Sequence, residues 1–290
     1  MMTSVKTPTT AARRRAAGRV IGFLALCFGA FLFIFPFYYM VVGALQAEPD
    51  PSISGAFPNP NELSFTNFHS INERVLLLRA LFNSVVYTAG VIGGTLIIGI
   101  LAGYALSRLR WRGRSVVFNL VLLTLIVPFQ LLMIPMYVLI VRGWGLADSY
   151  LGMILPFLVN STAVFIFRQF FMQLPEDMLD AARVDGAGEL RILTRIVLPL
   201  SRPAILTAAL ITFIGPWNEF LWPFLVTKKA EMQPLAVALA NYISAVAAST
   251  ANPFGAILAG AVVLAVPPAV LFVIFQRYFV ESETSTSLKE

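Results

Sequence analysis

The chain has 290 residues, of which 58% are hydrophobic and only 12% are charged. This charged share is about half of that in soluble domains, so no water-soluble core could bury the apolar surface, and the chain is predicted to lie in a membrane. The net charge of +6 does not indicate nucleic-acid binding, because the basic residues lie in short loops between apolar runs.

The chain begins with a basic segment, residues 1–19, which is predicted to be a cytoplasmic tail. The apolar run that follows is far longer than the roughly 7–15 residues of a signal-peptide core, and no clean cleavage site follows it, so we interpret it as a retained span. The run contains Cys27, and a single cysteine excludes an internal disulfide and a cysteine-based metal cluster. The single histidine, His69, lies in a polar loop, so no metal site is expected.

Six apolar runs reach or approach the roughly 20 residues that cross a bilayer as a helix. They are Val20–Leu45, Leu81–Leu106, Ser115–Val141, Ser149–Phe167, Pro203–Thr227 and Asn252–Gln276. The runs are continuous rather than alternating, which favours helices over strands. The sequence therefore predicts an all-α polytopic membrane protein with a six-helix transmembrane domain over residues 20–280 and a short tail, residues 281–290.

The distribution of lysine and arginine predicts the orientation of the spans. With the N-terminus in the cytoplasm, the inside segments hold Lys6, Arg13, Arg14, Arg15, Arg19, Arg108, Arg110, Arg112, Arg114, Arg168, Arg183, Arg191, Arg195, Arg202, Arg277 and Lys289. The outside segments hold only Arg74, Arg79, Arg142, Lys228 and Lys229. This positive-inside bias predicts that both termini are cytoplasmic.

Two predicted outside segments are long. The first, Gln46–Ala80, contains four prolines in its first half and is expected to be irregular there. The second, Lys228–Ala251, contains an apolar stretch over residues 234–248 that is too short to span comfortably. This stretch is predicted to be an interfacial or re-entrant helix, or a surface that packs on a partner.

The most informative segment lies between the predicted fourth and fifth spans, Leu174–Pro203. Pro175 suits the first position of a helix, and Glu176 and Asp177 complement the dipole at its N-terminus. Gly186 can end that helix, since glycine tolerates a left-handed cap. A short helix with a tight turn behind it is therefore predicted.

A second helical run, from Glu189 to Val197, follows and is expected to stop before Pro199. The segment therefore reads as a rigid elbow of two helices on the cytoplasmic face. Its small residues, which would let a partner approach closely, are Ala181, Ala182 and Ala187. Its carboxylates, Asp180 and Asp185, would cap a helix end or pair with basic groups. On spacing alone, a solvated loop between two spans is an equally good interpretation.

This elbow resembles the EAA motif of ABC importer permeases. The motif stands here as Asp180-Ala181-Ala182-Arg183-Val184-Asp185-Gly186-Ala187, followed by Ile196-Val197-Leu198-Pro199. Asp180 stands where the family usually has Glu, which keeps the charge. Three further segments resemble the carbohydrate branch with six spans, of the maltose type, and they are Asn83-Ser84, Trp217-Asn218-Glu219-Phe220 and Gln276-Arg277-Tyr278-Phe279-Val280.

The resemblance implies a permease subunit of an ATP-driven importer for a sugar or oligosaccharide in the bacterial cytoplasmic membrane. The implied partners are a second homologous permease, two cytoplasmic ATPase subunits, an extracytoplasmic sugar-binding protein and membrane lipid. In this family the loop docks into a groove of the ATPase, and the resemblance assigns that role to Asp180, Ala181, Ala182, Asp185, Gly186 and Ala187. The family often ends in a glycine-containing tail, whereas this chain ends in Leu288-Lys289-Glu290.

The sequence has no Walker A motif, because none of its lysines follows a glycine. The chain is therefore not expected to be an enzyme or to hold a cofactor, and ATP and magnesium are expected on the partner ATPase. A membrane-embedded enzyme is a further alternative, but the sequence has no set of residues typical of a catalytic site. The main alternative is a secondary transporter driven by an ion gradient. Such transporters usually have intramembrane acids or broken helices in two related halves, so the single deep carboxylate and the lack of an evident internal repeat argue against it.

Polar or aromatic side chains within the spans are candidates for the sugar pathway: Gln130, Asn160, Trp217, Asn218 and Glu219. Polar groups also join helices by hydrogen bonds, so each has a structural alternative. Glu219 is the one charge deep in an apolar run, and we expect its carboxylate to be satisfied by a partner subunit, other spans or water. Kinks are expected at Pro128, Pro135, Pro156, Pro216, Pro267 and Pro268, and close helix packing at Gly90, Gly94, Gly99 and Gly103.

Overall fold

The computed structural model describes residues 10–58, 60–246 and 253–287, and all regular secondary structure in these ranges is helical. One isolated bridge, between Gln46 and Leu63, is the sole strand-like pairing there. The predicted all-α class is therefore confirmed. The chain forms two compact units, residues 1–71 with 247–266 and residues 72–246 with 267–290.

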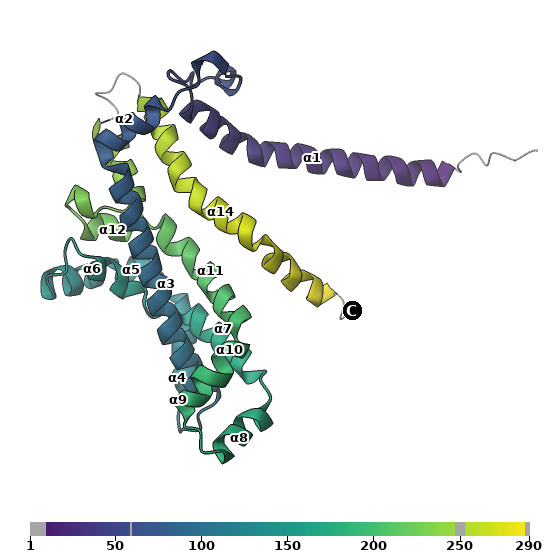
Figure 1. Cartoon of the computed structure of the whole chain (residues 1–290), viewed down its shortest axis with the longest axis vertical. Coiled ribbons are helices and arrows are strands. Elements are labelled where there is room, and N and C mark those ends of the chain that lie inside the picture. The colour runs from purple at the N-terminus through teal and green to yellow at the C-terminus, as the bar shows by residue number, and fades with distance from the viewer. Residues whose placement is uncertain (1–9, 59, 247–252, 288–290) are drawn as a thin grey trace, which may run out of the picture. The chain divides into compact units, whose positions relative to one another are not determined.

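The first unit is built around a long exposed helix, α1 (Thr10–Ala44) (Figure 1). Its apolar part, Gly18–Ala44, is 27 residues long and is almost entirely unburied, with Phe33 81% exposed. So large an apolar surface needs lipid or another protein chain to cover it. The unit also holds the turns η1 (Ile53–Ala56) and η2 (Pro60–Glu62), most of α2 (Thr66–Val75) and the start of α14 (Pro253–Ser287).

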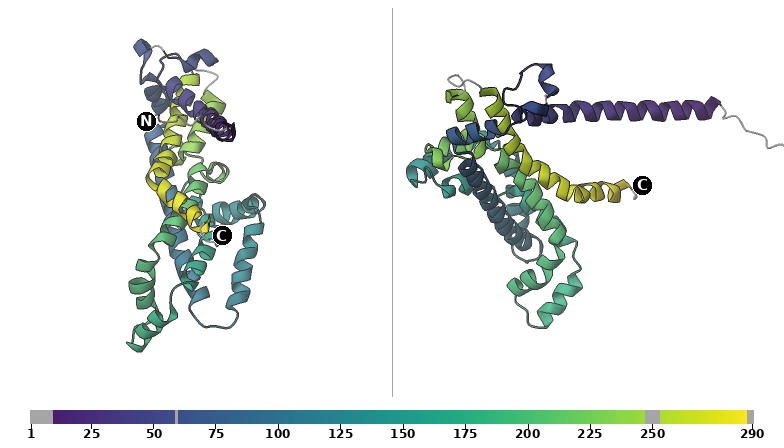
Figure 2. Two further views of the ribbon diagram at one scale, coloured as in Figure 1. Left: turned by 90° about the vertical axis from the view of Figure 1, so that its right-hand side faces the viewer. Right: turned by 45° about the horizontal axis from the view of Figure 1, so that its top comes forward.

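The second unit is centred on α3 (Leu77–Ser107), which packs against α7 (Ser161–Met172) and α11 (Arg202–Asn218) (Figures 1 and 2). Glycine permits the close approach of α3 and α7. A Cβ atom at Gly103 would lie 2.6 Å from Cβ of Phe167 and 3.0 Å from the amide nitrogen of Arg168. The expected packing role of the glycines in α3 is confirmed at this position.

Shorter helical elements complete the second unit. They are α4 (Arg114–Leu123), η3 (Thr124–Ile126), α5 (Phe129–Tyr137), η4 (Val138–Gly143), α6 (Tyr150–Ile154), η5 (Leu155–Phe157), α8 (Glu176–Val184), α9 (Glu189–Ile192), η6 (Leu193–Val197), α10 (Leu198–Leu200), α12 (Leu221–Val226), η7 (Ala230–Met232), α13 (Leu235–Asn241) and η8 (Tyr242–Val246). Of these, η4, η6 and η8 are π-helical.

Three helices are individually long and apolar enough to cross a membrane. They are Gly18–Ala44, Leu77–Ser107 and Pro253–Gln276, and they correspond to the predicted first, second and sixth spans. Pro267 and Pro268 lie within α14. The sequence correctly located these segments because their apolar runs are long and uninterrupted.

The predicted third and fourth spans are each broken into two helices rather than continuous. Arg114–Ile126 and Phe129–Gly143 meet at 95°, and Tyr150–Phe157 and Ser161–Met172 meet at 52°. Pro128 separates the first pair, because it has an extended backbone (ψ 130°) and no N–H to donate. If each bent pair counts as one span, the described part of the chain has up to six.

The predicted fifth span, Pro203–Thr227, is also not one helix. It divides into α11 and α12, because Glu219 has an extended backbone (φ −69°, ψ 123°) just after Pro216. At its other end α11 forms a bent pair with the helical stretch Glu189–Leu200, at an angle of 79°. The elbow helix therefore leads almost directly into α11.

The apolar outside stretch packs on the chain's own α3. Its helix α13 begins at Leu235, whose backbone N–H donates to Oγ of Ser84 at 2.8 Å. Nδ2 of Asn83 donates to the carbonyls of Glu231 and Gln233 at 2.9 and 3.0 Å. The sequence left open an interfacial or re-entrant helix or packing on a partner, whereas the structure shows α13 (Leu235–Asn241) packed on α3 of the same chain. The last two residues of the predicted stretch lie outside the described residues.

Candidate functional site

The elbow between α7 and α11 has the helix–turn–helix form that the sequence predicts. The turn after α8 contains Gly186, whose backbone is in the left-handed region with φ +80°. Its N–H donates to the carbonyl of Arg183 at 3.0 Å, and the N–H of Ala187 donates to the carbonyl of Ala182 at 2.9 Å. This pair of bonds is the Schellman motif, which satisfies carbonyls at the end of a helix. The turn is therefore fixed by α8's own backbone.

Two details of the predicted elbow are wrong. Pro175 is the residue before α8, with ψ 128°, rather than the first helical residue. The second helical run does not stop before Pro199 but continues through it into α10. The reason lies in the preceding π-helical segment, η6, because its wider hydrogen-bond spacing accommodates a proline that has no N–H.

One face of α8 is buried and the other is open. Leu179 is fully buried, and Ala182 and Ala187 pack against the same cluster, which includes Phe171 and Ile192. The small size of Ala182 and Ala187 therefore serves packing within this chain, and the close approach of a partner to the three alanines stays a prediction. A tryptophan at position 182 would have to displace this core.

The open face carries apolar side chains in solvent. Val184 is 87% exposed and Leu190 is 70% exposed, and Asp180 and Ala181 are also exposed. Isolated exposed apolar residues are common, but these two flank the tight turn at Gly186, between α8 and α9 (Figure 1). Of the predicted alanines, only Ala181 lies on this open face.

A charged network ties the two arms of the elbow together. Arg183 donates from one guanidinium nitrogen to Asp180 at 2.6 Å and from Nε to Glu189 at 2.9 Å. The hydrogen bond with Glu189, followed by that with Asp180, raises the pKa of the Arg183 guanidinium above its usual value. The same bond from Arg183 lowers the pKa of the Glu189 carboxyl. Both groups are therefore held in their charged forms.

The network also reaches α3. Oη of Tyr104 donates to Oε2 of Glu189 at 2.5 Å, across 85 positions of sequence. Arg108, just after α3, donates from Nε to the carbonyl of Phe171 at 2.8 Å and from Nη2 to that of Leu174 at 2.5 Å. These bonds anchor both the start and the turn of the elbow to the end of α3.

Asp185 does not have the expected capping role. Its backbone N–H continues the helix by donating to Ala181, but no hydrogen bond or ion pair of its side chain occurs among the described residues. The carboxylates that brace the turn are instead Asp180 and Glu189. Glu189 was predicted only as the start of a helix, because its partners Arg183 and Tyr104 come together through the tertiary fold.

The predicted pathway residues lie on several elements, namely α5, the start of α7 and the end of α11. Gln130 is exposed in α5, and Oδ1 of Asn160 accepts the N–H of Ala163 at 3.0 Å as the N-cap of α7. Asn218 donates to the carbonyl of Ile214 at 2.9 Å. Trp217 is 2% exposed and stacks on Phe213, with ring centroids 5.5 Å apart. Asn160 and Trp217 therefore make contacts within this chain, and the predicted pathway role of these residues stays a prediction.

Glu219 is half-buried at the break between α11 and α12. Its Oε1 accepts the backbone N–H of Trp222 at 3.2 Å, so the carboxylate caps the start of α12. The sequence predicted a partner subunit, other spans or water as the partner of this charge, whereas the structure shows a backbone group of the same predicted span. Since the helix ends here, Glu219 is not the mid-helix charge that a continuous span would contain.

Comparisons with known proteins agree with this architecture. The family described as "Binding-protein-dependent transport system inner membrane component" matches residues 95–283. The chain belongs to this family. The match begins within α3 and includes the elbow and α11. The chain is thus an inner-membrane transport component, and this confirms the resemblance to importer permeases.

Individual relatives cover almost the full chain. The arabinooligosaccharides transport system permease protein AraQ of Bacillus subtilis (strain 168) is 34% identical over 89% of this chain and 91% of its own length. The sn-glycerol-3-phosphate transport system permease protein UgpE of Agrobacterium fabrum is 34% identical over 94% of this chain and 98% of its own. Both relatives are transport permeases rather than enzymes.

A solved structure shares the fold. It is described as the crystal structure of a bacterial ABC transporter involved in the import of the acidic polysaccharide alginate. The TM-score is 0.80 and the identity is 25%, over 94% of this chain and 100% of that chain. The all-helical fold as a whole is therefore one already seen in an ABC transporter.

Proposed function

We propose that this permease forms, with a second homologous permease, the translocation pathway of an importer for neutral sugars or oligosaccharides. Energy would come from two cytoplasmic ATPase subunits, and substrate from an extracytoplasmic binding protein. The observation that carries this proposal is the elbow. A braced helix with an exposed apolar turn is the kind of element through which a separate ATPase could move α3 and α11.

The proposed contact with the ATPase is the open face of α8 and its turn. Val184 and Leu190 supply apolar area there, and Asp180 and Ala181 complete the surface. The brace formed by Arg183, Glu189 and Tyr104 supports the proposal, because a force applied at the turn would reach α3 through short charged bonds. Docking would bury Val184 and Leu190, which are otherwise left in water.

The substrate class is proposed from charge. The relatives differ in the substrates they are named for, since one name gives an oligosaccharide and another a phosphate ester. No lysine or arginine lies within the six predicted spans, and the only charge there is Glu219. The carboxylate of Glu219 would repel a phosphate ester, and no basic side chain of this chain's predicted spans would compensate it, so a neutral sugar fits better.

The proposed topology has six spans with both termini in the cytoplasm, as the positive-inside bias favours. Replacing Cys27, the single cysteine, by alanine gives a background for labelling single cysteines at Ser54 and Gly188. We expect an impermeant maleimide added outside intact cells to label position 54 and not position 188. Labelling of both positions, or of position 188 alone, would contradict the orientation.

The transport proposal is tested with the complete complex in vesicles that enclose ATP. We expect ATP-dependent uptake of a neutral oligosaccharide delivered by its binding protein, unchanged by an ionophore, and no uptake of sn-glycerol 3-phosphate. The alternative, a secondary transporter driven by an ion gradient, requires the opposite dependence. Uptake that needs no ATP and stops when the ionophore collapses the gradient would establish that alternative.

A further inference from the structure

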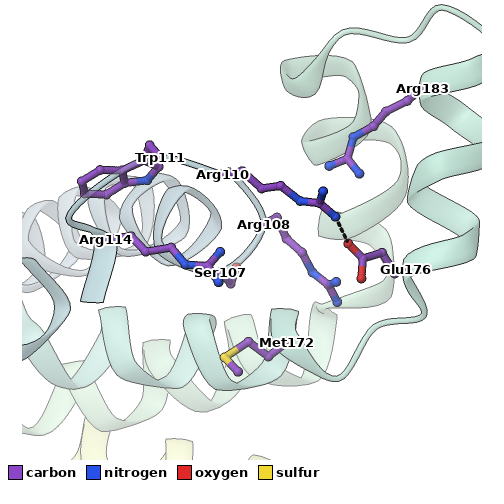
Figure 3. A pocket seen from close by; sticks show the side chains of 8 residues that line it. All are labelled: Ser107, Arg108, Arg110, Trp111, Arg114, Met172, Glu176 and Arg183. Carbon is purple, nitrogen blue, oxygen red and sulfur yellow. Dashed lines mark hydrogen bonds and ion pairs between the residues drawn. The ribbon is translucent and has the colours of Figure 1, made fainter. Parts of the chain in front are cut away.

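A basic pocket lies beside the elbow, where α3 and α7 end (Figure 3). Its volume is about 490 Å³, and its wall is formed by Ser107, Arg108, Arg110, Trp111, Arg114, Met172, Glu176 and Arg183. The residues come from the end of α3 and the loop behind it, from the first position of α4, from α7 and from α8. Four guanidinium groups and one carboxylate therefore share a single space.

Two of these four positive charges are not compensated by a carboxylate. Arg110 pairs with Glu176 at 3.3 Å, and Arg183 pairs with Asp180 and Glu189. Arg108 donates only to main-chain carbonyls, and so does Arg114, to Leu109 at 3.4 Å. Neither has an ion pair among the described residues, and Arg108 is also half-buried. A half-buried, uncompensated cation favours an anionic ligand.

The rim of the pocket has the composition of a membrane interface. The indole of Trp111 is 40% exposed while its Nε1 donates to the carbonyl of Ala105 at 3.0 Å. Met172 is 51% exposed on the same wall. Tryptophan with one satisfied polar end and an apolar body is typical of headgroup depth. The predicted spans that contain α3 and α7 end at this level.

We propose that this pocket binds the phosphate group of an anionic phospholipid of the cytoplasmic leaflet. Guanidinium groups hold phosphate oxygens through paired N–H donors, and basic pockets between spans on the cytoplasmic side suit lipid headgroups. Inorganic phosphate has the same chemistry, but it would make no use of the exposed indole and thioether. The side on which the lipid lies rests on the topology proposed above.

Such a lipid would join two parts of the coupling machinery. Arg108, Arg110 and Arg114 follow α3, whereas Arg183 belongs to α8. A phosphate that contacts both groups would add a second link between the elbow and the spans, beside the Tyr104–Glu189 bond. Anionic lipid would therefore increase the number of substrate molecules moved per ATP hydrolysed.

The test uses the purified importer complex and measures lipid binding by native mass spectrometry, with phosphatidylglycerol and phosphatidylcholine offered together. We expect preferential retention of phosphatidylglycerol, and Arg114→Gln should weaken that retention about tenfold through loss of a charge-assisted contact. Arg112→Gln is the matched control, because Arg112 is exposed in the loop directly before α4 but does not line the pocket. Arg108 is left intact because it holds the carbonyls of Phe171 and Leu174.

Three outcomes would overturn the proposal. The first is equal retention of the two lipids by the unaltered complex. The second is an equal loss of phosphatidylglycerol retention in Arg114→Gln and Arg112→Gln. The third is displacement of phosphatidylglycerol by excess inorganic phosphate, which would assign the pocket to free phosphate. Lipid retention is measured without ATP or substrate. It therefore stands or fails separately from the proposed transport function, which the uptake assay tests.

Discussion

Replacing Gly186 by valine is expected to abolish both transport and the stimulation of ATP hydrolysis by substrate. Gly186 has φ +80°, and a β-branched residue in the left-handed region costs roughly 1–2 kcal/mol or more. To escape that strain the turn would give up the bonds from Gly186 to Arg183 and from Ala187 to Ala182. The open face with Val184 would then point away from its proposed groove. Uptake and ATPase activity are measured in vesicles containing the complete complex.

Two control variants isolate the backbone conformation as the cause. A Cβ atom at Gly186 or at Gly188 would meet nothing within 4 Å, so bulk is not an issue at either position. Gly188 has an ordinary extended backbone (φ −69°), and Gly188→Val should keep most of the activity. Gly186→Asn should also remain active, since asparagine tolerates the left-handed region. If Gly186→Val transports as well as Gly188→Val, the elbow is only a connector.

The second large effect is expected for Glu189→Ala, which should uncouple ATP hydrolysis from uptake. The change removes the acceptor of both Arg183 and Tyr104 and leaves the hydroxyl of the buried Tyr104 without its partner. Bonds to a charged group contribute about 1.5–3 kcal/mol, and the 41% exposure of Glu189 reduces this to about 1–2 kcal/mol after screening. That is enough to loosen the elbow from α3 while the spans still insert.

The readout is the number of substrate molecules imported per ATP hydrolysed, which we expect to fall about tenfold. Asp177→Ala is the matched control, because Asp177 is exposed on α8, has no ion pair among the described residues and does not line the basic pocket. Tyr104→Phe removes only the link to α3 and should give an intermediate ratio. An unchanged ratio in Glu189→Ala, or equal losses in Glu189→Ala and Asp177→Ala, would contradict the proposed brace.

The sequence by itself determined the features that depend on neighbours within a few positions. Long apolar runs located α1, α3 and α14, because length and hydropathy alone decide whether a helix can cross a bilayer. Gly186 determined the turn, since a Schellman motif involves only residues of the helix end and its glycine. Pro128 and Pro216 marked two of the breaks, although the sequence did not give the angles.

The tertiary structure decided which side chains meet across long stretches of chain. Which face of α8 is buried depends on where α7 and α9 lie, and this separates Ala182 from Ala181. The Tyr104–Glu189 bond and the basic pocket exist because α3 and α7 end at the same level. Glu219 became a helix cap because the chain breaks there. Local backbone preferences act over about one helical turn, whereas these contacts depend on helix packing, which no local pattern specifies.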